Sequence, residues 1–166
     1  NTLIDITHHL IDFKTVCMTN YIVIKEVFMD ETVIVIMLKD KQTGFLEKEL
    51  SCYHLGEQQN ILLNIYAEQN EQNEITVFAK LTCEKEVSDW EYNAILDYYD
   101  METVKPFVNT IEELEGEYNP VWLVSFPFSD SQEEMEQKLC DILQSHQKEL
   151  YSVYEAIADK KDDYIE

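Results

Sequence analysis

Of the 166 residues, 34 are Asp or Glu, 12 are Lys and none is Arg, which gives a formal net charge of -22 at pH 7. Arginine is the side chain that grips phosphate with two parallel hydrogen bonds, and a strongly negative surface repels polyanions. This composition argues against a protein that holds nucleic acid, nucleotides or an anionic membrane surface.

The hydrophobic fraction of 45% is enough for one packed domain, so the charge is expected on the surface of a folded body. The longest apolar run, Val33 to Leu38, is far shorter than the roughly 20 residues that a membrane span needs. Charged residues interrupt the apolar stretch near the N-terminus, so no signal peptide is expected. We therefore expect a single domain over residues 1–166 in the cytoplasm.

The first forty residues combine a helical pattern with a strand pattern. Residues 21–29 and 32–39 are rich in β-branched residues and are separated by Asp30 and Glu31, which predicts two strands of a hairpin. Before them, apolar residues at steps of three and four predict a short amphipathic helix within residues 1–18. The residues of this helical stripe are Leu3, Ile6, Leu10, Phe13 and Cys17.

Turn residues separate the strands that follow. In the stretch 40–44, Gly44 stands where a left-handed residue closes a type I turn with a bulge, so residues 45–53 are predicted to return as a strand. Residues 75–83 alternate between apolar and polar side chains, which predicts a strand with one buried face. The polar residues 69–73 have the length of a hairpin loop. Residues 60–68, which precede that loop, fit either a strand or a helix.

A short helix is predicted next. Ser88 and Glu91 have the spacing of a capping box, which places a helix over residues 89–99. Two further strands are predicted over 104–109 and 121–128, with Pro120 and Pro127 marking strand ends or an edge position. Residues 112–118 are interpreted as an acidic connection with at most one helical turn.

The C-terminal third predicts one long amphipathic helix over residues 130–159, preceded by Ser and Asp and followed by a tail, 160–166, that frays. At about 1.5 Å per residue such a helix is roughly 45 Å long and can cross a whole sheet. Its apolar stripe consists of Met135, Leu139, Ile142, His146, Leu150, Val153 and Ile157.

The element order is helix, hairpin strands, short helix, two strands and long helix. This order predicts an α+β fold. We expect an antiparallel sheet of about five to seven strands, covered on one face by the long C-terminal helix and one or two shorter helices.

The sequence offers little for catalysis or cofactor binding. It contains neither a phosphate-binding loop, a dinucleotide fingerprint, a nucleophile elbow nor an HExxH pair. The nearest zinc-like pairs are Cys52 with His54 and His8 with His9, and they lack the paired spacing of structural zinc sites. We therefore predict no catalytic, cofactor or metal residues, and favour packed cysteines and surface histidines. His146, on the apolar stripe, is predicted to lie in the core or at an interface, with a hydrogen-bond partner.

The densest combination of aromatic and acidic residues lies near the short helix, and it is the candidate interaction surface. Tyr and Trp often anchor protein interfaces, and acids beside them select cationic partners. The favoured alternative is that this helix lays Trp90 and Tyr98 into the core and leaves its acids solvated. The candidate residues are Trp90, Glu91, Asp97, Tyr99 and Asp100.

The leading functional hypothesis is a non-catalytic protein-interaction module, such as an adaptor, a chaperone-like protein or a regulator. Its expected partner is a basic or apolar protein surface, or a second copy in a homodimer, and not nucleic acid or a membrane. One alternative is a nucleic-acid mimic that inhibits a DNA- or RNA-binding protein, and another is an enzyme with a dispersed carboxylate site. The acids available to a mimic are Glu133, Glu134, Glu136, Asp141, Glu149, Glu112, Glu113, Glu115 and Glu117.

Overall fold

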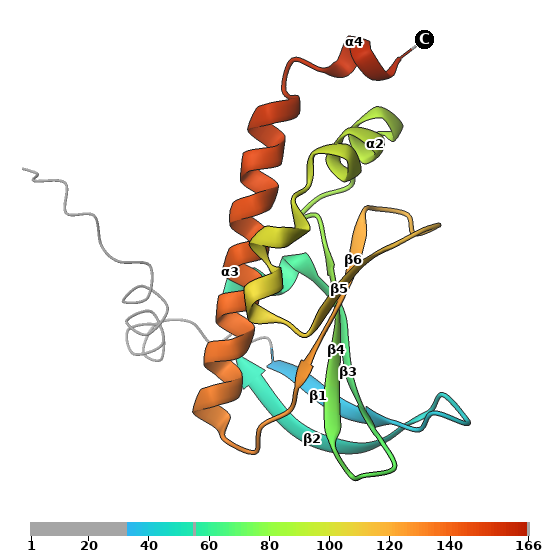
Figure 1. Cartoon of the computed structure of the whole chain (residues 1–166), viewed down its shortest axis with the longest axis vertical. Coiled ribbons are helices and arrows are strands. Elements are labelled where there is room, and N and C mark those ends of the chain that lie inside the picture. The colour runs from blue at the N-terminus through green and yellow to red at the C-terminus, as the bar shows by residue number, and fades with distance from the viewer. Residues whose placement is uncertain (1–32, 55, 166) are drawn as a thin grey trace, which may run out of the picture. The chain divides into compact units, whose positions relative to one another are not determined.

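The computed structural model describes residues 33–54 and 56–165, and residues 32–166 form one compact unit. Figure 1 shows a single twisted sheet with a long helix along one face. The elements are β1 (Val33–Lys39), β2 (Leu46–His54), η1 (Gly56–Ile61), β3 (Leu62–Gln69), β4 (Ile75–Thr82), α2 (Asp89–Tyr98), η2 (Met101–Thr103), η3 (Lys105–Phe107), β5 (Thr110–Leu114), β6 (Val121–Pro127), α3 (Gln132–Ile157) and α4 (Lys161–Tyr164).

The six strands of the sheet lie in the order β2-β1-β3-β4-β6-β5. Every neighbouring pair is antiparallel except β1 and β3, which are parallel. The predicted α+β class is confirmed, as is the long C-terminal helix on one face of a mostly antiparallel sheet. The predicted helix within 1–18 and strand over 21–29 lie outside the described residues. β1 itself is paired on both sides, by β2 and by β3.

The two predicted tight connections form as turn chemistry requires. Gly44 adopts φ 74°, and its amide donates to the carbonyl of Asp40 at 2.8 Å, which closes the β1–β2 hairpin. The Asp40 carboxylate also accepts from the amides of Gln42 and Thr43, and these hydrogen bonds lower its pKa. The β3–β4 hairpin turns at Asn73, which has φ 65°. Asn tolerates this left-handed conformation better than most residues.

In the middle of the chain the structure corrects two sequence-based predictions and decides a third that was left open. Residues 104–109 were expected to form a strand, but Pro106 has no amide hydrogen for a ladder, and the chain forms the short helix η3 at 105–107 instead. The acidic stretch around 112–118 contains the end of a strand, β5, at the edge of the sheet. The open alternative at 60–68 resolves into a 3-10 turn followed by strand β3.

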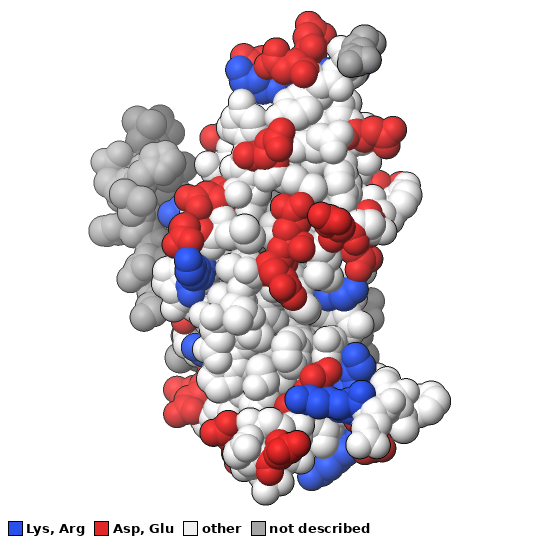
Figure 2. Space-filling model, turned by 45° about the vertical axis from the view of Figure 1, so that its right-hand side comes forward, with Lys and Arg blue, Asp and Glu red and all other residues white. Residues whose placement is uncertain are grey.

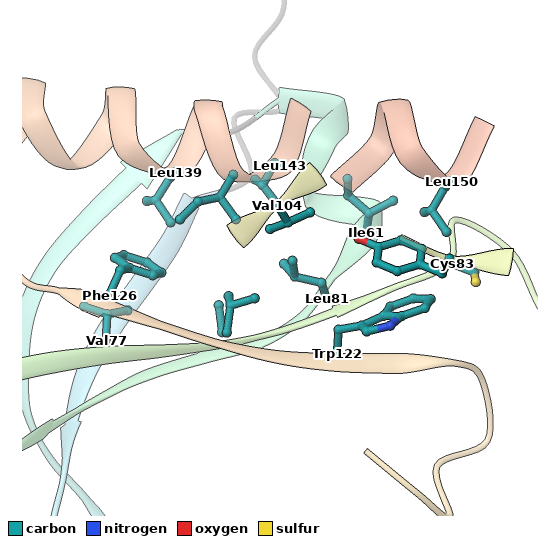
Figure 3. Close-up of a cluster of buried hydrophobic side chains, with 14 of the residues drawn as sticks. Ile61, Val77, Leu81, Cys83, Val104, Trp122, Phe126, Leu139, Leu143 and Leu150 are labelled. Atoms are coloured by element: carbon teal, nitrogen blue, oxygen red, sulfur yellow. The ribbon is translucent and has the colours of Figure 1, made fainter. Parts of the chain in front are cut away.

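The core lies between α3 and the face of the sheet that α3 covers. Figure 3 shows Val77, Leu81, Trp122 and Phe126 rising from the strands toward Leu139, Leu143 and Leu150 of the helix. Each of these side chains is almost completely buried. The stripe predicted on α3 is therefore core, because every third or fourth residue of the helix meets the sheet.

The tail 160–166, for which fraying was predicted, contains a short helix. Residues 161–164 form α4, which packs against α2. The hydroxyl of Tyr164 donates to Asp97 at 2.8 Å, and this hydrogen bond raises the pKa of Tyr164 to about 12. Tyr164 thus anchors the tail to α2, which the polar composition of the tail did not indicate. Among the helices that the structure describes, none combines the length and the apolar character needed to span a membrane.

Candidate interaction surface

The candidate interaction surface lies where α2 ends and the chain turns into η2. The capping box predicted at the start of α2 is present: the amide and hydroxyl of Ser88 both donate to Glu91, at 2.8 and 2.6 Å. These hydrogen bonds lower the pKa of Glu91. Trp90 is half-buried and packs against the core. The first turn of α2 is thus fixed by its cap and by one aromatic contact.

At the C-terminal end of α2 the side chains of the consecutive residues Tyr98 and Tyr99 point in different directions. The helix ends at Tyr98, and Tyr99 takes an extended conformation with φ -72° and ψ 121°. This change of direction sends the ring of Tyr99 into the core, where 8% of its surface is exposed, and leaves Tyr98 with 43% exposed. The prediction that Tyr98 enters the core is wrong, and Tyr99 is not available as part of a surface.

Tyr99 joins a buried cluster with Trp122, His146 and the end of β4. Its ring stacks on Trp122 with centroids 4.0 Å apart, and its hydroxyl lies 2.7 Å from Nδ1 of His146. The other ring nitrogen, Nε2, lies 2.9 Å from the carbonyl oxygen of Thr82. Because a carbonyl only accepts, Nε2 carries the proton, and neutral Nδ1 accepts from the hydroxyl of Tyr99. The predicted buried, partnered histidine is confirmed.

Burial controls the protonation of this cluster. His146 has no exposed surface, and burial lowers its pKa to about 4, since a charged imidazolium loses its hydration there. Burial also raises the pKa of Tyr99, and it raises the pKa of the nearby Cys83 thiol to about 11. All three groups are neutral at pH 7, so the cluster is a structural support rather than a source of protons or a nucleophile.

Helix α3 holds the turn after α2 at three successive places. Tyr99 contacts His146 as described, the amide of Asp100 donates to Glu149 at 3.0 Å, and the hydroxyl of Ser145 donates to the carbonyl of Thr103 at 2.8 Å. The Asp100 side chain in turn accepts from the amide of Glu102. The turn is therefore fixed to the most deeply packed helix of the fold.

Five exposed side chains project from this fixed turn, and we call them the α2–η2 patch. Two are apolar or aromatic, with 43% of Tyr98 and 37% of Met101 exposed, and three are acidic. Of the residues predicted from sequence, Asp97 and Asp100 belong to the patch, Trp90 and Glu91 lie half-buried beside the cap, and Tyr99 lies beneath it. The patch consists of Asp97, Tyr98, Asp100, Met101 and Glu102.

Sequence reasoning missed Met101, Glu102 and the outward turn of Tyr98. The usable indication was the spacing of Asp100 and Glu102, since an Asp that caps the residue two positions on ends a helix and starts a turn. If the predicted helix had ended at residue 98 instead of 99, Tyr99 would have been predicted to be extended and to point into the core.

The acids considered for a nucleic-acid mimic are distributed over separate elements. Glu112 and Glu113 are neighbours in β5, so their side chains point to opposite faces of the sheet. Glu136 and Asp141 accept hydrogen bonds from glutamines on α3, at 2.7 and 2.8 Å, and Glu149 holds the turn after α2.

In the described part of the chain, no group of three or more His, Cys, Asp or Glu side chains is arranged to hold a metal ion. Cys52 and His54 are both exposed on β2. Cys83 is a buried free thiol, as expected of a packed cysteine, whereas Cys52 is exposed and the buried Cys140 is disulfide-bonded, so the expectation is wrong for these two. A shallow hollow of about 500 Å³ lies at the far side of α3, lined by Asn60, Glu84, Lys85, Gln147, Tyr151 and Tyr154.

Residues 29–165 match the model of a family of unknown function, DUF6762. The chain belongs to this family. The match spans every described helix and strand, so the α2–η2 patch and its buried support lie within the family's domain. Neither a curated protein nor a solved structure matches this DUF6762 member.

Proposed function

We propose that the chain is a non-catalytic protein-interaction module whose α2–η2 patch binds a basic segment of a partner protein. The observation that carries the proposal is the exposure of Tyr98 and Met101 among three acids on a turn that α3 fixes. Aromatic and methionine side chains are enriched at the centres of protein interfaces. Acids around them favour a partner that offers lysine or arginine beside an apolar side chain.

The fixed turn supports binding because it lowers the entropic cost of association. A loop that must become ordered on binding loses part of its interaction energy to that ordering. Here the hydrogen bonds that Ser145 donates to Thr103, and that His146 and Glu149 accept from Tyr99 and Asp100, hold the turn of the patch in place before a partner arrives. Tyr98 adds a rigid ring with few rotatable bonds, which suits an anchor residue.

The overall charge supports the same class of partner. A body with a net charge of -22 attracts cationic proteins over a distance of about 8 Å at physiological salt and repels acidic ones. The association rate with a basic partner should therefore fall as salt is added, while the apolar contact of Tyr98 and Met101 should depend little on salt.

The test is capture of proteins from a lysate on three immobilised forms, followed by identification. The patch variant is Tyr98→Ser with Met101→Ser. The matched control, Tyr118→Ser with Leu63→Ser, removes an exposed tyrosine and an exposed aliphatic side chain outside the patch. We expect the wild type and the control to capture the same basic proteins at low salt, and the patch variant to lose them. Identical capture by all three forms would refute the patch as the binding site.

A variant that removes two charges distinguishes the electrostatic attraction of the partner from the apolar contact with it. In Asp97→Asn with Asp100→Asn, each amide keeps an oxygen that can accept from Tyr164 and Glu102, so the turn is preserved. Affinity for a captured partner should become less dependent on salt, with the slope of log Kd against log salt reduced. An unchanged slope would show that these carboxylates do not face the partner.

A further inference from the structure

A second surface, opposite α3, carries a separate inference. The inward side chains of the strands meet α3, so the alternate residues point to the other face, over which Figure 1 shows none of the described helices. At its centre Tyr66 and Phe78 stack with centroids 5.4 Å apart. Val33 and Val35 are 41% and 38% exposed beside them. We call Val33, Val35, Met37, Tyr66, Phe78 and Leu123 the open face.

Of the charges around the open face, Glu49 and Glu112 stand opposite Met37 and Leu123 and point to the same side, and the five others are compensated locally. Nζ of Lys39 and of Lys41 lie 3.9 and 3.8 Å from the carboxylate of Glu68, and Nζ of Lys80 lies 2.6 Å from Glu117. The ammonium of Lys39 also lies 4.5 Å from the ring centroid of Tyr66. Figure 2 shows lysines gathered toward the lower right of the view, beside a largely uncharged area. On an acidic molecule, this is a face where a like-charged body can approach with little repulsion.

The edges of the sheet are poorly suited to pairing with another strand. β5 has only five residues and carries Glu112 and Glu113. β2 departs from regular register at two places along β1, and the carbonyl of Cys52 accepts from Gln132 of α3 at 3.0 Å. Short acidic edges and bulges are the devices by which proteins avoid edge-to-edge association. Association of the sheet with another molecule is therefore left to the open face.

The size of the open face sets the strength of the contact. The outer face of the whole sheet is larger than the open face and sets an upper limit: six strands about 4.8 Å apart, each about seven residues long at a rise of about 3.3 Å, cover roughly 24 by 23 Å, or about 550 Å². Two such faces bury at most on the order of 1,100 Å², below the range of stable protein interfaces. The contact is therefore weak and reversible.

We propose that the open face binds the open face of a second copy, forming a weak twofold dimer by sheet-on-sheet packing. A twofold contact is self-complementary, so Val35 of each copy enters the same interface, and one substitution acts twice. The compensated lysines remove the local repulsion, while the rest of each body stays strongly negative. Association should therefore strengthen as salt is added, opposite to the behaviour proposed for the α2–η2 patch.

The experiment is sedimentation velocity of the full chain over a range of protein and salt concentrations. We expect a reversible monomer–dimer equilibrium that shifts toward dimer with salt. Val35→Glu should weaken dimerisation by at least about tenfold, because the new carboxylate is buried twice in the contact. The control, Tyr98→Glu, lies in the patch and should leave the dimer unchanged. A monomer under all conditions, or equal effects of both variants, would overturn the proposal.

A second measurement locates the contact independently of any substitution. On dilution of the wild type, the methyl resonances of Val33, Val35 and Met37 should shift together as the dimer dissociates. Shifts confined to residues on α3 or in the patch would overturn the open face as the interface. Because the salt dependences of dimerisation and partner capture have opposite signs, failure of this proposal and failure of the proposed function are distinguishable.

Discussion

The buried histidine makes a quantitative prediction about the pH dependence of stability. In the folded chain the pKa of His146 is lowered to about 4, whereas in the unfolded chain it returns to its ordinary value of 6.5. Above pH 6.5 the residue is neutral in both states. As the pH falls from 6.5 toward 4, only the unfolded state takes up the proton, so the free energy of unfolding decreases.

The magnitude follows from the two pKa values. Each pH unit between them costs about 1.4 kcal/mol, so lowering the pH from 7 to 5 should remove about 2 kcal/mol of stability through this residue alone. Acid also has a stabilising effect, because it relieves repulsion among the carboxylates. The net charge of -22 at pH 7 approaches zero near the sequence pI of about 4.3. Glu84 also opposes the shift of His146 by favouring its charged form.

The two effects are separated by comparison with His146→Gln. Glutamine does not titrate, and its amide can still donate toward Thr82 and accept from Tyr99. Denaturant unfolding of both proteins between pH 7 and pH 5 gives the difference in their free energies of unfolding, from which carboxylate repulsion cancels. This difference should change by about 2 kcal/mol over that range, to the disadvantage of the wild type. A difference that is constant with pH would refute a buried, neutral His146, as would a pKa near 6.5 measured by NMR.

Five further substitutions, at four positions, test individual contacts and one turn by thermal or denaturant unfolding. Tyr99→Phe should cost about 1–3 kcal/mol, because Nδ1 of His146 loses its donor while the ring stays in place; a neutral effect would contradict the hydrogen bond. Ser88→Ala should lower the free energy of unfolding by about 1 kcal/mol, because it removes the cap of α2. The folded protein should keep its helix content, as measured by circular dichroism. Leu150→Ala should cost about 2–5 kcal/mol if this position is core, whereas a loss below about 1 kcal/mol would place it at a surface. Gly44→Ala meets nothing within 4 Å, so its cost of about 1 kcal/mol should come only from the φ of 74°, and Gly44→Asn should cost less.

The parts of the fold that the sequence predicts are those where local chemistry and burial agree. Residues 75–82 alternate because one face meets α3, and the stripe of α3 repeats because the helix crosses the whole sheet. The cap at Ser88 and the turn at Gly44 depend on contacts within a few residues. Patterns of this kind survive in the folded state because tertiary contacts reinforce them.

The predictions that failed concern segments whose structure depends on distant partners. β5 consists of Thr, Ile and Glu and has weak strand character, but β6 supplies hydrogen-bonding partners along its length. The tail at 161–164 is polar, and Tyr164 orders it only because Asp97 lies within reach. The segment after Val104 has β-branched residues, and the proline at 106 overrides them. In each case a partner distant in the sequence, or a missing amide, outweighed the local propensity of the segment.

The same reasoning explains why the candidate surface was half predicted. Composition located the aromatic and acidic residues near α2, but which tyrosine faces solvent depends on where the helix ends. That end is set by His146, 47 positions away from Tyr99 in the sequence, whose neutral Nδ1 offers the hydroxyl of Tyr99 a buried partner. Burying a tyrosine hydroxyl without such a partner is costly. Without His146, the core would therefore have no preference between the rings of Tyr98 and Tyr99. The histidine in the core therefore selects which tyrosine is exposed beside Met101. Under the proposed function, a substitution at 146 that keeps the fold but frees Tyr99 should weaken binding at the patch, although residue 146 is not part of it.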